Sequence, residues 1–234
     1  MVIIGRRGYD RFADSLRAAG YDPVPLEGLS GLNEIVADHA DTLICEVSGR
    51  FLLPRGAVEN LPERAVRILS GRLRIASVAP RGVYPGDVCL NALTVGKKLF
   101  GRLASLSEDV KTLARDAGFD LVNVKQGYAK CAAARLGNAV ITADRGLSKA
   151  IRAACGGSVD LLVIPAGGIK LEGCEYGFIG GASFVDEKRR RAVFFGSLPE
   201  NFSREVKDFC AARGYEIIEL DGELTDVGGA VILE

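Results

Sequence analysis

One pattern recurs along this chain and limits what it can fold into: an amphipathic helix, a glycine, an aromatic residue, an acid and then an apolar strand. The clearest copies span residues 10–28, 108–127 and 204–222. Apolar residues three and four positions apart, such as Val110, Leu113 and Ala114, predict the buried face of a helix. A glycine then ends each helix, because glycine adopts the left-handed C′ conformation at little cost. Ser107 and Ser203 are the predicted N-caps of the second and third helices.

Two weaker copies, at 63–78 and 148–164, bring the number of units to five. The predicted helix-ending glycines are Gly20, Gly71, Gly118, Gly156 and Gly214. Each unit also contains a strand rich in small residues, followed by a second apolar strand. The small-residue strands are predicted at Thr42–Val47, Asp87–Val95, Tyr128–Leu136, Tyr176–Val185 and Asp226–Leu233. The second strands are predicted at Phe51–Leu53, Lys98–Phe100, Ala139–Thr142, Ala192–Phe195 and Met1–Ile4.

The second strand of the fifth unit lies at the start of the chain, so that unit takes strands from both ends. We therefore predict an α/β fold, a five-bladed propeller of ββαβ units around a pseudo-fivefold axis. The helices lie outside, and the small-residue strands surround a central channel. Residues 1–234 form a single domain, closed by pairing of strand 1–5 with strand 226–233. The alternative is an ordinary two-domain α/β protein whose segments are similar by chance.

Composition argues against several classes of protein. Lys and Arg number 30, as do Asp and Glu, so we expect neither a general nucleic-acid binder nor a polybasic membrane anchor. No apolar run reaches the ~18 residues of a membrane helix, and Met1–Arg7 lacks the order of a signal peptide. Six widely spaced cysteines without a CxxC pair indicate reduced thiols and a cytoplasmic location. The single histidine excludes a His-rich zinc site, and we expect no metal and no cofactor. Oligomeric state stays open.

Three segments carry a resemblance to a known group of proteins: VKQGYAKC (124–131), YGFIGGAS (176–183) and LTDVGG (224–229). With the fivefold pattern, they resemble a bacterial branch of the pentein superfold, also called the guanidino-group-modifying enzymes. That superfold includes arginine and agmatine deiminases, dimethylargininases, amidinotransferases and a non-enzymatic ribosome-binding initiation factor. The resemblance implies a nucleophilic cysteine late in the chain, an acid/base histidine, and carboxylates that hold a guanidinium group. A thiolate suits this reaction because the guanidinium carbon is a poor electrophile.

The sequence departs from the pattern of these enzymes in two places. The late Gly-rich segment, 226–234, contains no cysteine, and the only histidine, His39, lies early in the chain. Asp38 and Asp41 beside it suggest a solvated turn. The Cys/His pair of the relatives therefore cannot be carried over by position. We expect no deiminase or amidinotransferase activity of the usual kind, because fold alone does not restore an activity.

Cys131 is the candidate nucleophile. It lies near the start of the third small-residue strand, where a side chain would line the channel, and the adjacent Lys130 could activate a thiol. Alternation along a strand would place Lys130 and Cys131 on opposite faces. The alternative is that Cys131 is a small buried apolar residue. Lys125, Gln126, Tyr128 and Lys130 are candidate ligand-binding residues around a glycine turn, or simply an exposed loop.

Carboxylates recur at the start of several units. Asp87 and Asp226 occupy similar positions, and Glu175 is the nearest counterpart in the fourth unit. Converging on one channel mouth, they could bind a cation or perform acid/base chemistry, whereas each could also simply form a turn. Gly180 and Gly181 could hold a ligand through their backbone N–H groups, or allow close packing around the axis.

The sequence thus leaves three function classes. The first is a protein that binds a small polar, cationic ligand, such as a guanidino or amine compound, in its central channel. The second is a diverged hydrolase or transferase that uses Cys131 with Asp87 or Asp226. The third is a ribosome- or protein-binding adaptor, and the basic run Lys188–Arg191, predicted as a hairpin turn, could contact an acidic partner or RNA.

Overall fold

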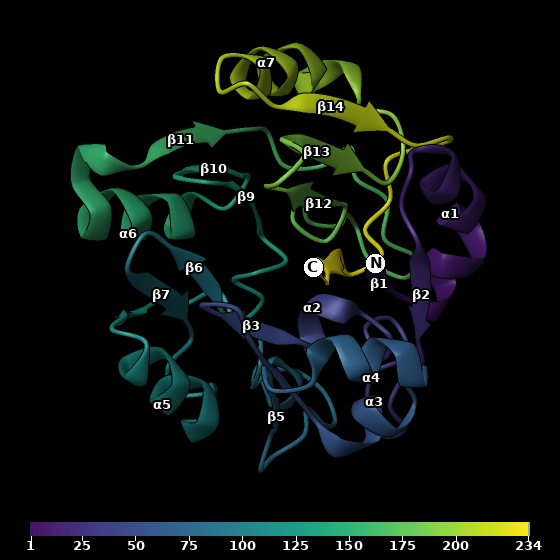
Figure 1. Ribbon diagram of the computed structural model, residues 1–234. Helices are drawn as coiled ribbons and strands as arrows, with labels where there is room; N and C mark the ends of the chain where they lie inside the picture. Colours follow the sequence, from purple (N-terminus) through teal and green to yellow (C-terminus); the bar gives the residue numbers. More distant parts are fainter. Residues whose placement is uncertain (234) are drawn as a thin grey trace.

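The computed structural model describes residues 1–233. Figure 1 shows small sheets arranged around a common centre, with the longer helices on the outside. The strands are β1 (Val2–Gly5), β2 (Pro23–Leu26), β3 (Cys45–Val47), β4 (Arg50–Leu53), β5 (Leu73–Ile75), β6 (Leu93–Val95), β7 (Lys98–Gly101), β8 (Asp120–Asn123), β9 (Ala133–Leu136), β10 (Ala139–Thr142), β11 (Asp160–Val163), β12 (Ser183–Asp186), β13 (Arg191–Phe194), β14 (Glu216–Glu219) and β15 (Ala230–Ile232). They form five three-stranded sheets.

Every sheet has the same topology. Its central strand pairs antiparallel with an inner strand and parallel with a third strand. The inner strands are β3, β6, β9, β12 and β15. In the sheet of the fifth unit the inner strand β15 pairs with the central strand β1, with Val2 opposite Ile232 and Ile4 opposite Ala230. The predicted fold of five ββαβ units is therefore confirmed. That the whole of 1–234 forms one domain stays a prediction, and Glu234 lies outside the described residues.

Helices connect the central strand of each unit to its third strand. They are α1 (Arg6–Ala18), α3 (Arg55–Glu59) with α4 (Glu63–Leu69), α5 (Glu108–Asp116), α6 (Arg145–Cys155) and α7 (Glu200–Ala211). The predicted cap Ser107 is confirmed, because its hydroxyl accepts from the backbone N–H of Val110 at 3.3 Å. The predicted cap Ser203 is wrong: α7 begins a turn earlier, and Pro199 precedes its first residue. All five predicted helix-ending glycines have a positive φ, between 57° and 85°.

The inner strands are shorter than predicted. The strand expected over Tyr128–Leu136 is observed only at β9, and the residues before it form a turn in which the N–H of Ala132 donates to the Tyr128 carbonyl at 2.9 Å. The corresponding segments of the first two units contain short helices, α2 (Ala40–Leu43) and η1 (Gly86–Val88). Small and polar residues there favour local turns over a strand ladder. These turns carry the candidate site.

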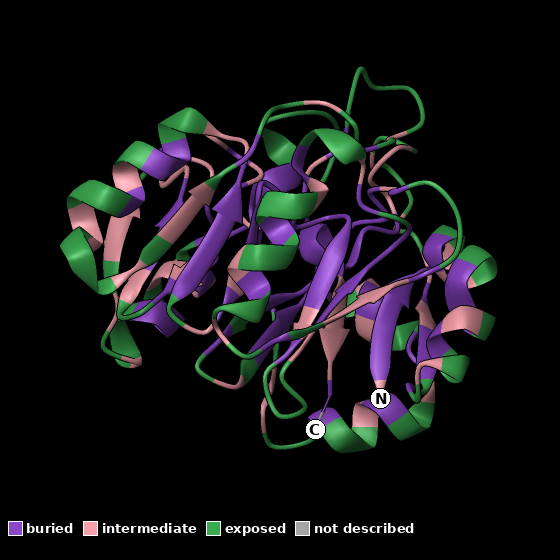
Figure 2. Cartoon of the chain, turned by 90° about the horizontal axis from the view of Figure 1, so that it is seen from above, coloured by how far each residue is buried: buried purple, intermediate pink, exposed green. Residues whose placement is uncertain are grey.

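Strands supply most of the core. The residues of β1 and β10 are all buried, whereas each longer helix buries one side and exposes the other, as Figure 2 shows. Lys188–Arg190 forms the predicted hairpin turn between β12 and β13. Within residues 1–233 no helix is long and apolar enough to cross a membrane.

Candidate functional site

A cavity of about 330 Å³ lies where the turns that precede the inner strands meet. We call it the thiol pocket. Its lining consists of Asn33, Ile35, Val36, His39, Tyr128, Cys131, Leu171, Cys174, Glu175, Tyr176, Phe178 and Asp226. Its volume lies within the range of small-molecule sites. The structure thus brings Cys131 together with Asp226, Glu175 and Tyr128, which the sequence singled out separately.

Cys131 lies in the turn before β9 and is buried. The side-chain amide of Asn91 donates to Sγ at 3.0 Å and to the carbonyl of Asp41 at 2.9 Å. Burial, followed by the negative charges of Asp41 and Asp226, holds the pKa of the Cys131 thiol well above its usual value. Lys130 lines a different cavity, and its charge does not offset the effect of burial on the thiol. The resting form of Cys131 is therefore the neutral thiol.

His39 is buried, with 4% of its surface exposed, so the expectation of a solvated turn is wrong. Asp38 beside it is also buried, and its carboxylate accepts from the backbone N–H of Arg7 at 2.8 Å. Burial lowers the pKa of the His39 imidazole, against the opposing effects of Asp226 and Asp38. A side chain on Gly228 would overlap with His39, so only glycine fits there. The imidazole is therefore neutral at pH 7 and able to accept a proton.

Two backbone groups hold the Asp226 carboxylate in the pocket. Its carboxylate accepts from the N–H of Phe178 at 2.8 Å and from the N–H of Gly228 at 3.0 Å. A side chain on Gly181 would overlap with the carboxylate. Burial raises the pKa of Asp226, and the neighbouring His39 opposes this rise. The carboxylate is thus positioned rigidly beside the histidine.

Asp87 does not line the thiol pocket. It lies in η1, where its carboxylate accepts from the Tyr128 hydroxyl at 2.5 Å. Burial, followed by this hydrogen bond, raises the pKa of Tyr128. The Tyr128 ring packs against Phe178, with ring centroids 6.4 Å apart. Asp87 therefore positions a wall of the pocket rather than contributing to its surface.

The remaining predicted ligand-binding residues have local roles. The side-chain N–H of Gln126 donates to Asp144 at 2.8 Å, and its carbonyl oxygen accepts from the N–H of Tyr128 at 3.0 Å. Lys125 is exposed. The carbonyl of Gly181 accepts from the N–H of Gly229 at 2.7 Å, and a Cβ on Gly180 would lie 2.5 Å from the Lys130 carbonyl. Neither glycine lines the thiol pocket, and their part in ligand binding stays a prediction.

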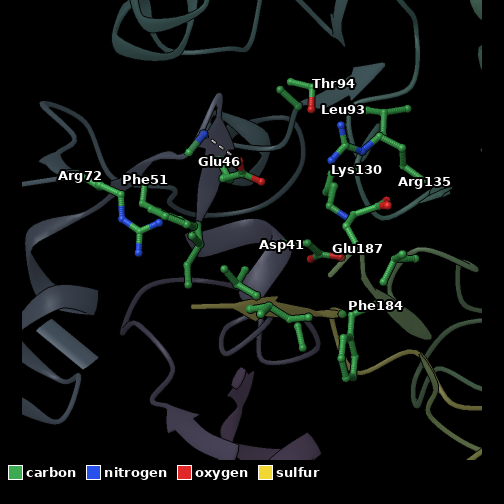
Figure 3. Close-up of a pocket in the computed structure, with 18 residues that line it drawn as sticks. Asp41, Glu46, Phe51, Arg72, Leu93, Thr94, Lys130, Arg135, Phe184 and Glu187 are labelled. Atoms are coloured by element: carbon green, nitrogen blue, oxygen red, sulfur yellow. Dashed lines mark hydrogen bonds between the residues drawn. The ribbon is translucent and has the colours of Figure 1, made fainter. Parts of the chain in front are cut away.

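Lys130 lines a second cavity, of about 360 Å³, which we call the mixed-charge pocket. Residues of all five inner strands line it, so it occupies the predicted central channel. Figure 3 shows Asp41, with Lys130 and Arg135 on one side of the pocket and Phe51 and Arg72 on the opposite side. It shares no lining residue with the thiol pocket. Lys130 and Cys131 face different cavities, as predicted, although they lie in a turn and not in the predicted strand.

Sequence reasoning missed several residues of these sites: His39, Asp41, Asn91, Cys174, Tyr176 and Phe178. Asp41, Asn91 and Cys131 all lie two to four residues before an inner strand. Aligning the units on these strands places Asn91 and Cys131 at the same position and Asp41 two positions earlier. Among residues 1–233, no group of three or more His, Cys, Asp or Glu side chains is arranged to hold a metal ion.

Solved structures resemble this fold over most of its length. A histidine-to-glycine variant of dimethylarginine dimethylaminohydrolase, an adduct with S-methyl-L-thiocitrulline, matches with a TM-score of 0.60 at 14% identity, covering 94% of this chain and 91% of that chain. The enzyme from Pseudomonas aeruginosa, as a cysteine-to-serine variant complexed with citrulline, gives a TM-score of 0.59, the same identity and the same coverage. An adduct of dimethylarginine dimethylaminohydrolase with 4-chloro-2-hydroxymethylpyridine gives 0.55 at 16% identity.

These matches define the class: the chain has a pentein-like α/β fold. A family model matches residues 3–231, so the chain belongs to the family DUF6873, described as a family of unknown function. A search of curated proteins finds no match.

Proposed function

We propose that this protein binds a small cationic molecule, with a guanidinium or amine group, in the thiol pocket. One observation carries the proposal: the acidic side chains lining this pocket are Glu175 and Asp226, and no Lys or Arg of residues 1–233 lines it. Acidic groups without a nearby cation favour a positively charged ligand.

Three aromatic rings support the same ligand class. Tyr128, Tyr176 and Phe178 line the thiol pocket beside the two carboxylates. An aromatic face attracts a cation through its quadrupole, and a planar guanidinium group also stacks on it. Citrulline and S-methyl-L-thiocitrulline, which structurally similar enzymes hold, are close in shape to a guanidino compound. The aromatic rings therefore favour a ligand whose positive charge lies on a planar group, such as a guanidinium.

Calorimetric titration with L-arginine, agmatine and L-citrulline tests this proposal. Citrulline replaces the guanidinium group of arginine by a neutral ureido group of similar shape, so we expect at least tenfold weaker binding of citrulline. Glu175→Gln should weaken arginine or agmatine binding by a similar factor. Glu172→Gln is the matched control, because Glu172 is exposed on the same loop and does not line the pocket. Equal affinity for arginine and citrulline would contradict the proposal.

A second candidate function is a thiol-dependent hydrolase acting on that cation. The observation that favours it is that Cys131 and His39 line the same pocket as the two acids. A bound cation would lower the pKa of the Cys131 thiol, which burial and two carboxylates otherwise raise. The thiol proton would pass to His39, whose low pKa leaves it neutral and ready to accept.

In that reaction Sγ of Cys131 would form a bond with the guanidinium carbon. The amine would leave with the proton returned by His39, giving a thiouronium bound to Cys131. Water would then add to the same carbon, and the C–S bond would break to release a ureido product and the thiol. The overall change is the replacement of an amine by water oxygen, with no oxidant or reductant.

Matched alkylating agents test this second function. Chloroacetamidine is cationic and chloroacetamide is neutral at pH 7, but they have almost the same shape. In a Cys174→Ser background, which removes the exposed cysteine of the pocket, Cys131 should react at least tenfold faster with chloroacetamidine. Cys155, half-buried and outside the pocket, is the internal control and should show no such preference. No preference at Cys131, together with no ureido product from arginine or agmatine, would exclude the hydrolase.

A further inference from the structure

The mixed-charge pocket contains a buried carboxylate that the surrounding groups balance only in part. Asp41 lines this pocket and is 4% exposed. Neither of its carboxylate oxygens has a well-formed hydrogen bond, although the Cys131 thiol and the Thr42 hydroxyl are neighbours. Burial raises the pKa of Asp41, and the Cys131 thiol, followed by the charge of Lys130, opposes the rise. Buried carboxylates almost always accept well-formed hydrogen bonds, so Asp41 can still accept one from a bound donor.

Two cations of the same pocket lack a direct ion pair among the described residues. The ammonium group of Lys130 and the guanidinium group of Arg135 have no ion pair and no side-chain hydrogen bond within residues 1–233. Burial lowers the pKa of Lys130, the charge of Asp41 opposes this, and the charge of Arg135 adds to it. The two cations therefore lie close enough to repel each other. Two adjacent cations are stabilised by an anion placed between them.

The other charged groups of the pocket are already engaged. Glu187 accepts from the Tyr215 hydroxyl at 2.5 Å and from the N–H of Gly137 at 2.6 Å. Glu46 accepts from the N–H of Gly49 at 3.0 Å. Arg72 lies over the Phe51 ring, 5.4 Å from its centroid. A ligand could therefore place one anionic group beside Lys130 and Arg135 and one hydrogen-bond donor beside Asp41.

We infer that the mixed-charge pocket is a second ligand site, for a small zwitterion such as an α-amino acid. Its carboxylate lies between Lys130 and Arg135, and its ammonium group donates to Asp41. The volume of about 360 Å³ accommodates a molecule of this size. This site is separate from the thiol pocket and does not depend on the function proposed for that pocket.

Thermal unfolding with each of the twenty common amino acids at 20 mM tests the inference, with propionate and ethylamine as single-charge controls. We expect at least one amino acid to raise Tm by 2 °C or more, and neither control to do so. Arg135→Gln and Lys130→Gln should each abolish the rise. Glu175→Gln should keep it, because Glu175 lines only the thiol pocket.

Amide NMR then locates the binding. With the stabilising amino acid, backbone resonances of Thr94 and Ala230, which line the mixed-charge pocket, should shift, while those of Tyr176 should not. Three results would overturn the inference: no amino acid stabilises the protein, propionate stabilises it equally, or the rise survives in both Arg135→Gln and Lys130→Gln.

Discussion

The two pockets lie side by side along one turn of the chain, yet their charges differ. Lys130 enters the mixed-charge pocket and Cys131 enters the thiol pocket, although they are consecutive residues. The cavities have similar volumes, but the thiol pocket is lined by carboxylates without a Lys or Arg of residues 1–233, whereas the mixed-charge pocket is lined by both. Their difference therefore comes from the direction of each side chain near the axis and not from the fold, which repeats five times.

Asp226→Ala should produce the largest effect, because it breaks the thiol pocket alone. It removes the acceptor of two backbone N–H groups, those of Phe178 and Gly228. Leaving two such donors without partners costs about 3–5 kcal/mol in the free energy of unfolding. Urea denaturation measures it. Glu223→Ala, an exposed acid three residues earlier, should cost less than 1 kcal/mol, and equal costs for the two variants would contradict the prediction.

Asn91→Ala tests the residue that joins the two pockets. Asn91 is fully buried, donates to Cys131 and to the Asp41 carbonyl, and accepts from the N–H of Lys130 at 2.8 Å. We expect a loss of about 2–4 kcal/mol in urea denaturation, since a cavity and unpaired polar groups are left together. Asn138→Ala, in an exposed hairpin turn, is the control. A loss below 1 kcal/mol would mean that the two pockets are not joined through Asn91.

His39 should make the stability of the protein depend on pH. Burial lowers its folded-state pKa below the unfolded value of 6.5. Below pH 6.5 the unfolded state therefore binds more protons, and stability contributed by the neutral form is lost as pH falls. The slope cannot exceed about 1.4 kcal/mol per pH unit for one group. Denaturation of the wild type and of His39→Gln between pH 5 and 8 measures it. Parallel curves for the two proteins would refute the prediction.

Arg135→Gln should have the smallest effect on stability. It tests the comparison in the mixed-charge pocket, whereas Asp226→Ala tests it in the thiol pocket. Arg135 has no ion pair within residues 1–233 and lies near Lys130. Removing it should change the free energy of unfolding by no more than about 0.5 kcal/mol, with relief of repulsion favouring a slight gain. A loss above 1.5 kcal/mol in the free energy of unfolding, measured by urea denaturation, would show that Arg135 stabilises the fold and is not free to bind a ligand.

Much of this fold follows from local sequence signals, because they recur. Five glycines end the helices where the pattern places them, and Ser107 caps α5. The sites were harder to predict. Cys131, Asp226 and Tyr128 were found from their positions before inner strands, but His39 was assigned to solvent because acids flank it. His39 is buried because other units pack around it near the centre of the fold. The charges of its sequence neighbours do not reveal that packing.

The position of Asp87 teaches the same lesson. Its resemblance in position to Asp226 suggested two carboxylates in one pocket, yet Asp87 accepts from the Tyr128 hydroxyl behind the pocket wall. Asp87 lies six residues before β6, whereas Asp226 lies four residues before β15, so their side chains point in different directions. Sequence repetition fixes where a turn occurs, but the direction of a side chain depends on packing.

The pairing of β1 with β15 has a consequence for synthesis. Val2, Ile3 and Ile4 are fully buried in the finished protein, but their inner-strand partner is made some 230 residues later. At roughly 5–20 residues per second, a ribosome needs about 10–45 seconds to deliver it. During that time β1, which is apolar, lacks the strand that pairs with one of its edges. The nascent chain is therefore most vulnerable to association with other chains until β15 emerges.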